Sequence, residues 1–352
     1  MKTLKGKHAF KTPHVPSHYL NTDLKLLPQY LKEVGYSTHL VGKWHLGWQA
    51  KGTLPLERGF DSFYGILGSE FHPFLHSSGR PMLYDGNSLV DQSGDHATYL
   101  FSDRANQILS TPSDNPKFIY LSYTAPHAPH YAPEDLKKVV REELEALNPG
   151  VNIDERYVIY QAMIRGMDIG VEQIYNTAQD ITDRETIIIF GSDNGGATMF
   201  QQWATGSQYA GKMKSLTGCN YPLKGKKSSI NEGGVRIPLL LTSTKRQLAP
   251  IKRILNHSID WFATMLELAK VENIPENIDG VSLAKTIYNP ELSHKESKIR
   301  DRLIIGVFHQ WNKISSGKFS DSVGVEKIFC LLKHLHNVIK IFSLENSICS
   351  DL

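Results

Sequence analysis

The stretch GYSTHLVGKWHLG, residues 35–47, joins an apolar strand pattern to a loop with two chemically active side chains. The apolar run stops at Gly42, which is typical of a strand that enters a loop. Lys43 and His45 follow at once, two residues apart. If both are extended, their side chains leave the same face of the strand. A cation beside an imidazole suits the binding of a small oxyanion such as sulfate or phosphate.

Helical and strand patterns alternate along the chain on both sides of this stretch. Several strands are continuous apolar runs, as expected where helices cover both faces of a sheet, and residues 186–190 make the most buried-looking one. The pattern predicts an α/β sandwich with a largely parallel central sheet between helices. The predicted helices are 22–34, 95–109, 154–180 and 258–269, and the predicted strands are 39–41, 117–123, 186–190 and 237–242.

Helix ends and one buried face can also be predicted. Thr22 or Asp23 is expected to cap the first helix and Gly35 to end it, and Ser258 is the candidate cap of the last one. Helix 95–109 carries an apolar stripe that should face the core. That stripe consists of Tyr99, Leu100, Ala105, Ile108 and Leu109.

The composition indicates a globular protein with 40% hydrophobic and 21% charged residues. A net charge of +3, with no dense basic block, does not indicate a nucleic-acid partner. No run approaches the roughly 18 apolar residues of a membrane span. The first residues lack the apolar core of a signal peptide, so no signal peptide is predicted. One glycosylation sequon begins at Asn256.

Three further loops carry polar residues directly after predicted strands or near glycines. Residues 191–196 read GSDNGG, and Asp193 and Asn194 offer two hard oxygen ligands for Ca²⁺ or Mg²⁺. The alternative is that this segment is only a turn. Residues 125–130 read APHAPH, where prolines would hold His127 in a stiff loop, although a loop histidine can also be merely solvated.

The third of these loops, residues 222–238, is basic and rich in glycine. Lys224, Lys226 and Lys227 could face an anion, but for Lys224 and Lys226 a solvated turn is the better interpretation. The sequence Glu-Gly-Gly at 232–234 is expected to need an unusual backbone. Together the four loops supply cations, imidazoles and a pair of metal-binding oxygens, a combination that suits one anionic ester.

These motifs resemble the sulfatase family. Residues 35–47 are similar to its second signature, and Asp-Asn-Gly at 193–195 and the segment 227–238 match in the family's order. Residues 54–61 resemble the arylsulfatase B group in particular. The resemblance covers roughly residues 20–285. It implies an alkaline-phosphatase-like α/β fold, hydrolysis of sulfate esters, and a bound Ca²⁺ with Asp193 and Asn194 as ligands.

The resemblance also implies roles for the cations and histidines. Lys43 and Lys227 would bind the sulfate and offset its charge. His45 would hold or deprotonate the hydroxyl of the nucleophile. His127 would contact the sulfate and protonate the leaving oxygen. The implied ligand is a sulfated glycan or another sulfate ester, and the implied location is lysosomal or secreted.

The sequence departs from the family's pattern at the nucleophile. Sulfatases use a formylglycine made from cysteine in a Cys-x-Pro-x-Arg signature, which these 352 residues do not contain. Cys219, Cys330 and Cys349 all lie after the lysine–histidine motif, and no Asp-Asp pair is present to complete the calcium site. We therefore divide the chain into an atypical segment 1–19, a partial sulfatase catalytic domain 20–285 and a diverged or truncated, incomplete C-terminal subdomain 286–352.

Several functional interpretations remain open from the sequence. The chain could be an arylsulfatase B-like hydrolase by descent, with negligible activity as given because its covalent nucleophile is missing. It could instead be a non-catalytic binder of sulfated ligands, or a chain that does not fold as an independent domain. A phosphoryl hydrolase of the same superfold fits Lys43, His45 and Lys227 less well.

Overall fold

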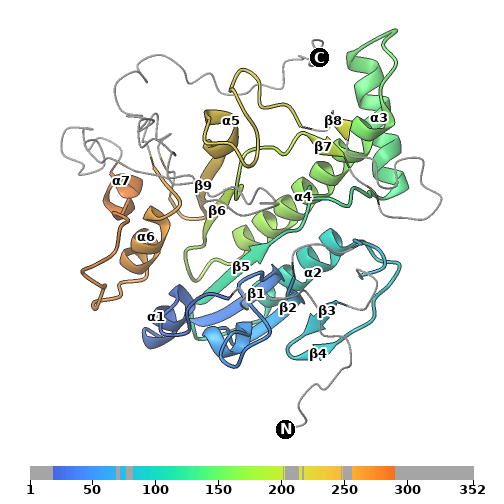
Figure 1. Ribbon diagram of the computed structural model, residues 1–352. Helices are drawn as coiled ribbons and strands as arrows, with labels where there is room; N and C mark the ends of the chain where they lie inside the picture. Colours follow the sequence, from blue (N-terminus) through green and yellow to red (C-terminus); the bar gives the residue numbers. More distant parts are fainter. Residues whose placement is uncertain are drawn as a thin grey trace, which may run out of the picture.

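A five-stranded mixed sheet with the order β4-β3-β2-β1-β5 organises the first half of the fold (Figure 1). The computed structural model describes residues 19–68, 72–76, 82–200, 202, 214–215, 218–246, 248 and 256–289. Its strands are β1 (Ser37–Lys43), β2 (Ser62–Ile66), β3 (Leu83–Asp85), β4 (Ser88–Leu89), β5 (Lys117–Ser122), β6 (Ile187–Gly191), β7 (Met199–Phe200), β8 (Lys214–Ser215) and β9 (Leu239–Ser243).

Helices cover this sheet and pack on one another, with the long helix α4 running beside α2 and α3 (Figure 1). A short 3₁₀ helix, η1 (Pro55–Arg58), precedes β2. The α-helices are α1 (Leu27–Glu33), α2 (Ala97–Ser110), α3 (Glu134–Leu147), α4 (Glu155–Asp180), α5 (Glu232–Val235), α6 (Asp260–Leu268) and α7 (Ala284–Tyr288).

Strand β1 lies at the centre of the sheet and pairs in parallel with both β2 and β5. Its side chains alternate between two buried clusters, as the two-residue period of a strand requires. Leu40 packs with Phe63 on one face, and Val41 packs with Phe101 of α2 on the other. Both faces of the parallel strands are therefore covered, and the predicted α/β sandwich with a mostly parallel centre is confirmed.

The strand pair β6–β9 is separate from this sheet and antiparallel. Arg184, before β6, holds it beside the start of β5, since its guanidinium donates to the carbonyl oxygens of Asn115 at 2.8 Å and Ser113 at 2.9 Å. The prediction that residues 186–190 form the most buried strand is wrong. Residues 187–190 are only half-buried because β6 has a strand partner on one side alone within the described residues.

The first and last helices begin later than predicted. Helix α1 starts at Leu27, with Pro28 in its first turn, so Thr22 and Asp23 lie in the preceding turn rather than at a cap. Gly35 follows its end at φ +88°, as predicted. Ser258 does not cap α6. The buried Asp260 carboxylate instead accepts from the backbone N–H of His257 at 2.8 Å and of Val281 at 3.0 Å.

Helix α2 buries a face slightly rotated from the predicted one, because it packs on α4 as well as on the sheet. Ala105 and Leu109 are buried as predicted, whereas Tyr99, Leu100 and Ile108 are half-buried. No helix among the described residues is long and apolar enough to cross a membrane. The predicted C-terminal subdomain, 286–352, lies almost wholly outside the described residues.

Candidate active site

The carboxyl end of β1 is shaped by Gly42, where three strands come very close. This residue has φ +107°, and a Cβ added there would lie 2.0 Å from the carbonyl oxygen of Ser122 in β5. Gly65 of β2 approaches from the other side. A Cβ added to Gly65 would lie 1.8 Å from the carbonyl oxygen of Gly42. Only glycine allows this close approach. The chain therefore leaves the sheet directly before Lys43 and His45 with its neighbours fixed on both sides.

Lys43 is the last residue of β1 and is half-buried, whereas His45 is exposed and has φ +58°. The condition that both are extended, under which their side chains would leave the same face, is therefore not met, because the chain turns between them. Trp44 anchors that turn: its ring is 6% exposed, and its indole N–H donates to the carbonyl oxygens of Gly47 at 2.8 Å and Thr53 at 3.0 Å. The turn places His45 outside the strand.

His127 lies in the loop that follows β5, next to β1 in the sheet. Its backbone N–H donates to the Thr124 oxygen at 2.8 Å, and its ring Nδ1 lies 2.7 Å from the carbonyl oxygen of Ala128. A carbonyl only accepts, so Nδ1 carries a proton and Nε2 is the nitrogen left for a ligand. Lys43 thus ends β1, and His127 follows β5, the parallel neighbour that is paired with β1 up to Gly42 and Ser122.

His96, which the sequence reasoning did not single out, fixes the backbone four residues beyond His127. It is 4% exposed at the start of α2, and burial lowers its pKa to about 4, so the ring is neutral. Nδ1 accepts from the backbone N–H of Thr98 at 3.3 Å, and Nε2–H donates to the carbonyl oxygen of Tyr131 at 3.1 Å. Its place at the start of the predicted helix 95–109 was the available signal, because side-chain acceptors at a helix start can cap the helix.

The loop after β6 brings Asp193 and Asn194 together with the basic loop that holds Lys227. The backbone N–H of Lys227 donates to the Gly196 oxygen at 3.0 Å, and that of Gly195 donates to the Gly234 oxygen at 3.0 Å. Asp193 is exposed, and Asn194 and Lys227 are half-buried. Two of the predicted loops, far apart in sequence, are therefore joined by direct backbone hydrogen bonds.

The glycines at 233 and 234 serve close packing rather than an unusual backbone. Both lie inside the short helix α5, and neither has a positive φ, so the expectation of a special conformation is wrong. A Cβ on Gly233 would lie 2.3 Å from the Gly225 oxygen, and one on Gly234 would lie 2.1 Å from the Ser229 oxygen. The helix can approach the lysine loop only because both residues lack a side chain.

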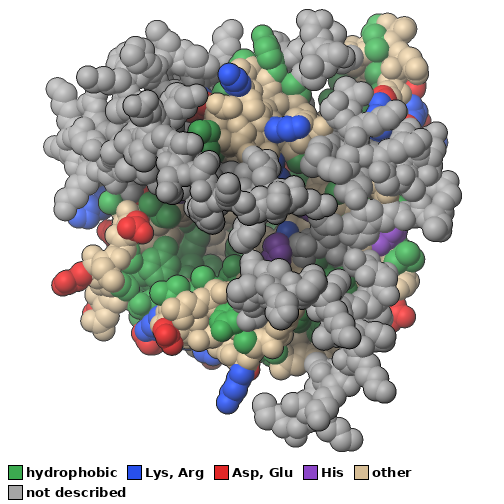
Figure 2. All heavy atoms as spheres, viewed as in Figure 1, with side chains coloured by type: hydrophobic (Ala, Val, Ile, Leu, Met, Phe, Trp, Pro, Cys, Tyr) green, Lys and Arg blue, Asp and Glu red, His purple; other side chains and the backbone are tan. Residues whose placement is uncertain are grey.

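The two halves of the site are related through the start of β5, because Arg184, before β6, donates to the carbonyl oxygens of Asn115 and Ser113. Burial raises the pKa of Tyr120 in β5, and the negative charge of Asp193 raises it further. Near its centre, Figure 2 shows a histidine side chain with a basic side chain beside it, between the sheet below and the region around α5 above. Lys43 and His127 thus stand at the ends of two neighbouring parallel strands, and backbone hydrogen bonds join the loop of Asp193 to the loop of Lys227.

The described residues do not by themselves make a complete calcium site. Ca²⁺ takes six to eight oxygen ligands. Asp193 and Asn194 supply side-chain oxygens, and the Asn194 amide nitrogen is turned to the Gly195 oxygen at 3.0 Å. Within the described ranges, no group of three or more His, Cys, Asp or Glu side chains is arranged to hold a metal ion. We therefore derive no chemical step through calcium.

Comparison with known proteins identifies the family. A sequence model of the sulfatase family matches residues 4–271, so this chain belongs to the sulfatase family. Arylsulfatase J of Mus musculus is 33% identical over 297 residues, covering 80% of this chain and 45% of that protein. N-acetylgalactosamine-6-sulfatase of Homo sapiens is 27% identical over 285 residues, covering 76% of this chain and 49% of that protein.

A solved structure is similar over much of the chain. The crystal structure of Ps i-CgsB in complex with k-i-k-neocarrahexaose has a TM-score of 0.62 at 26% identity, and covers 78% of this chain and 60% of that chain. The fold is therefore of the alkaline-phosphatase-like class. The chain spans about half the length of the curated relatives it matches.

Proposed function

We propose that the loops at the ends of β1, β5 and β6 bind the sulfate group of a sulfate ester. The observation that carries this proposal is that Lys43 and His127 stand at the ends of neighbouring strands and that the Lys227 loop is hydrogen-bonded to the loop of Asp193 and Asn194, in a chain of the sulfatase family. Two cations on separate loops can offset the charge of one sulfate. The whole protein would then hydrolyse sulfate esters of glycans or aryl sulfates, in the manner of arylsulfatase B.

Each side chain has a defined part in this proposal. Lys43 and Lys227 stabilise negative charge that develops on the transferring sulfuryl group. His127 contacts the sulfate through Nε2, the ring nitrogen not turned to Ala128. In its doubly protonated form it donates the Nε2 proton to the leaving oxygen and becomes a neutral imidazole that keeps its Nδ1 proton. His45 takes a proton from the hydroxyl of the nucleophile. Asp193 and Asn194 would be two of the ligands of a calcium ion, which when bound would supply Lewis acidity.

The nucleophile decides whether these 352 residues turn over a substrate. They contain no Cys-x-Pro-x-Arg signature from which formylglycine could form. We therefore expect binding of sulfate esters with negligible hydrolysis, because the covalent route is missing. Calcium should bind weakly, since two side-chain ligands fall short of its usual number. A sulfatase homologue that binds sulfated ligands without catalysis is the second candidate function.

Calorimetric titration with a sulfated disaccharide tests the binding site. Lys43→Ala and Lys227→Ala should each weaken binding about tenfold or more, because a hydrogen bond to a charged group contributes about 1.5–3 kcal/mol. Lys226→Ala is the matched control, since Lys226 is an exposed neighbour in the same loop. Equal affinity of all three variants and the unsubstituted chain would exclude this sulfate site.

Turnover of an aryl sulfate in the presence of calcium tests the hydrolase proposal separately. We expect no product above the uncatalysed rate from the folded chain as printed. We expect hydrolysis from a longer chain that adds an in-frame Cys-x-Pro-x-Arg segment and carries formylglycine. Failure of such a formylglycine-containing chain to hydrolyse any sulfate ester would contradict the proposed function.

We also propose a lysosomal or secreted location, in keeping with the family resemblance. The sequon at Asn256 lies in the turn before α6, and Asn256 is half-buried. Modification there would add a sugar chain at the edge of the α6 turn. Mass spectrometry of the protein from a secretory host, before and after removal of N-linked glycans, measures this modification directly.

A further inference from the structure

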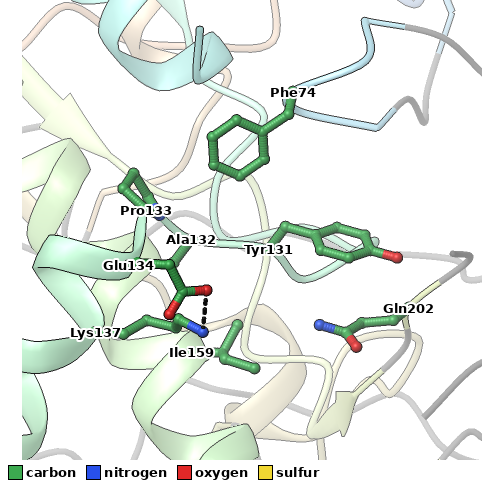
Figure 3. A pocket seen from close by; sticks show the side chains of 8 residues that line it. All are labelled: Phe74, Tyr131, Ala132, Pro133, Glu134, Lys137, Ile159 and Gln202. Atoms are coloured by element: carbon green, nitrogen blue, oxygen red, sulfur yellow. Dashed lines mark ion pairs between the residues drawn. The ribbon is translucent and has the colours of Figure 1, made fainter. Parts of the chain in front are cut away.

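A cavity of about 400 Å³ lies beside the candidate active site, on the loop that continues from His127 into α3 (Figure 3). Its apolar lining includes Phe74, Tyr131 and Ile159, and its polar lining includes Gln202 and the Glu134–Lys137 pair. This volume falls in the range of small-molecule sites, which combine apolar walls with a few polar groups. The cavity has the size and lining of a binding site for one sugar ring.

Both aromatic rings are held in place from behind. The carbonyl oxygen of Phe74 accepts from the Gly94 N–H at 2.8 Å, and its ring lies edge-on to His96 with centroids 4.8 Å apart. The Tyr131 carbonyl accepts from His96 Nε2 at 3.1 Å, and the Tyr131 ring packs on His72 at 4.1 Å between centroids. One buried histidine therefore positions both aromatic walls before any ligand arrives.

The polar groups of the cavity carry no excess positive charge. Lys137 lies 2.6 Å from Glu134 and 3.4 Å from Glu155, so acidic groups on both sides neutralise it. Gln202 is 7% exposed, and its amide nitrogen donates to the His130 oxygen at 2.7 Å. A second sulfate would find no uncompensated cation among these residues. The chemistry instead suits the hydroxyl groups and apolar face of an uncharged pyranose, which stack on aromatic rings.

The position of the cavity relates it to the sulfate site. Tyr131 lies four residues after His127 in one loop. A second, small cavity is lined by His127, by His96, which also contacts Phe74 and Tyr131, and by Pro73, the residue before Phe74. Resting on the proposed function, we propose that the Phe74–Tyr131 cavity is a subsite for the uncharged sugar ring next to the sulfated one. The substrate class is thereby narrowed to oligosaccharides in which a sulfated sugar is linked to an unsulfated pyranose.

Calorimetry with three ligands tests this subsite: inorganic sulfate, galactose 4-sulfate, and a disaccharide that joins galactose 4-sulfate to unsulfated galactose. The unsubstituted chain should bind the disaccharide about tenfold more tightly than the monosaccharide, as expected for one stacked ring. Phe74→Ala and Tyr131→Leu should each abolish that difference and leave binding of inorganic sulfate unchanged. Tyr175→Leu, on the partly exposed surface of α4, is the matched control.

Fluorine NMR of protein labelled with 3-fluorotyrosine separates failure of the subsite from failure of the sulfate site. The resonance of Tyr131, assigned by its loss in Tyr131→Phe, should shift with the disaccharide and with excess methyl β-galactoside, but not with inorganic sulfate. If sulfate and galactose 4-sulfate do not bind, the proposed function fails, and a Tyr131 shift with methyl β-galactoside still supports the subsite. A Tyr131 resonance unmoved by both sugars overturns the subsite, whatever the sulfate result.

Discussion

Replacement of Gly42 by alanine tests how the sheet positions Lys43. The added Cβ would lie 2.0 Å from the Ser122 carbonyl oxygen and 2.6 Å from its carbon, both backbone atoms of the paired strand. Backbone atoms in a continuous ladder cannot swing away as a flexible side chain does. The strands β1 and β5 must therefore separate at the point where Lys43 and His127 leave the sheet.

Two terms set the size of the effect. An alanine held at φ +107° costs about 1–2 kcal/mol through steric strain in the backbone. Forcing extra volume into a packed contact costs about 1–3 kcal/mol more. Gly42→Ala should therefore lower the free energy of unfolding by about 2–5 kcal/mol, a large fraction of the stability of an ordinary domain.

Gly35→Ala is the control that separates the two terms. Gly35 also has a positive φ, +88°, but no heavy atom lies within 4 Å of its Cβ position. Gly35→Ala should therefore lower the free energy of unfolding only by the backbone strain of about 1–2 kcal/mol. Urea unfolding followed by circular dichroism measures both variants, and sulfate affinity should fall only in Gly42→Ala. Equal destabilisation by the two substitutions would refute the steric argument.

Three further predictions concern polar groups with specific hydrogen-bond partners. Arg58 is 3% exposed and donates to the carbonyl oxygens of Asn21, Thr22 and Leu24, so Arg58→Ala should cost about 3 kcal/mol in urea unfolding. Burial alone would raise the pKa of Asp61, but hydrogen bonds from Lys32 and Thr38 bring it below its usual value. Its stabilising contribution is therefore present above about pH 4 and is lost on further acidification, and Asp61→Asn should remove that loss. Burial lowers the pKa of His96 to about 4, so the unfolded chain binds this proton first. Stability should fall by about 3 kcal/mol from pH 6.5 to 4, and the fall should be smaller in His96→Gln.

The elements with strong local signals could be predicted from the sequence. Residues 117–123 and 154–180 correspond to β5 and α4 within one residue at each end. Both have an apolar pattern of a single period, bounded by turn residues or by a cap such as Asp154, whose carboxylate accepts from the Arg156 N–H at 2.8 Å. For these segments, local preference and tertiary packing favour the same structure.

Other elements depend on contacts that no local pattern reveals. Helix α3 is mostly charged, buries only Leu136 and Val140, and is tied to α4 by ion pairs such as Lys137 with Glu155 at 3.4 Å. Strand β2 contains Gly65. A glycine weakens the sequence pattern of a strand, but it is required here because the backbone of Gly42 in the paired strand β1 comes so close. The order of pairing, and hence the separation of β6 from the main sheet, is likewise a long-range property.

The same limit applies to the candidate site. Sequence order suggested that Lys43, His127, Asp193 and Lys227 belong together because each follows a strand or a glycine-rich turn. It could not show that His45 leaves the strand at φ +58°, since that depends on where Trp44 is anchored. Nor could it find the Phe74–Tyr131 cavity, because those rings come from loops far apart in the sequence, which meet through His96 and His72.

The two halves of the site are held by different kinds of interaction, and this has a consequence for ligand binding. Lys43 and His127 extend from a sheet with continuous parallel ladders, whose backbone hydrogen bonds form together. The Lys227 loop is attached by isolated backbone bonds and by the Asn220 amide, which contacts the Gly196 N–H and oxygen and the Gly225 oxygen at 3.0–3.2 Å. Isolated bonds open independently, whereas a ladder opens cooperatively. The strand ends with Lys43 and His127 would therefore be formed before a ligand binds. A sulfate that bridges Lys43 and Lys227 would then fix the Lys227 loop against them.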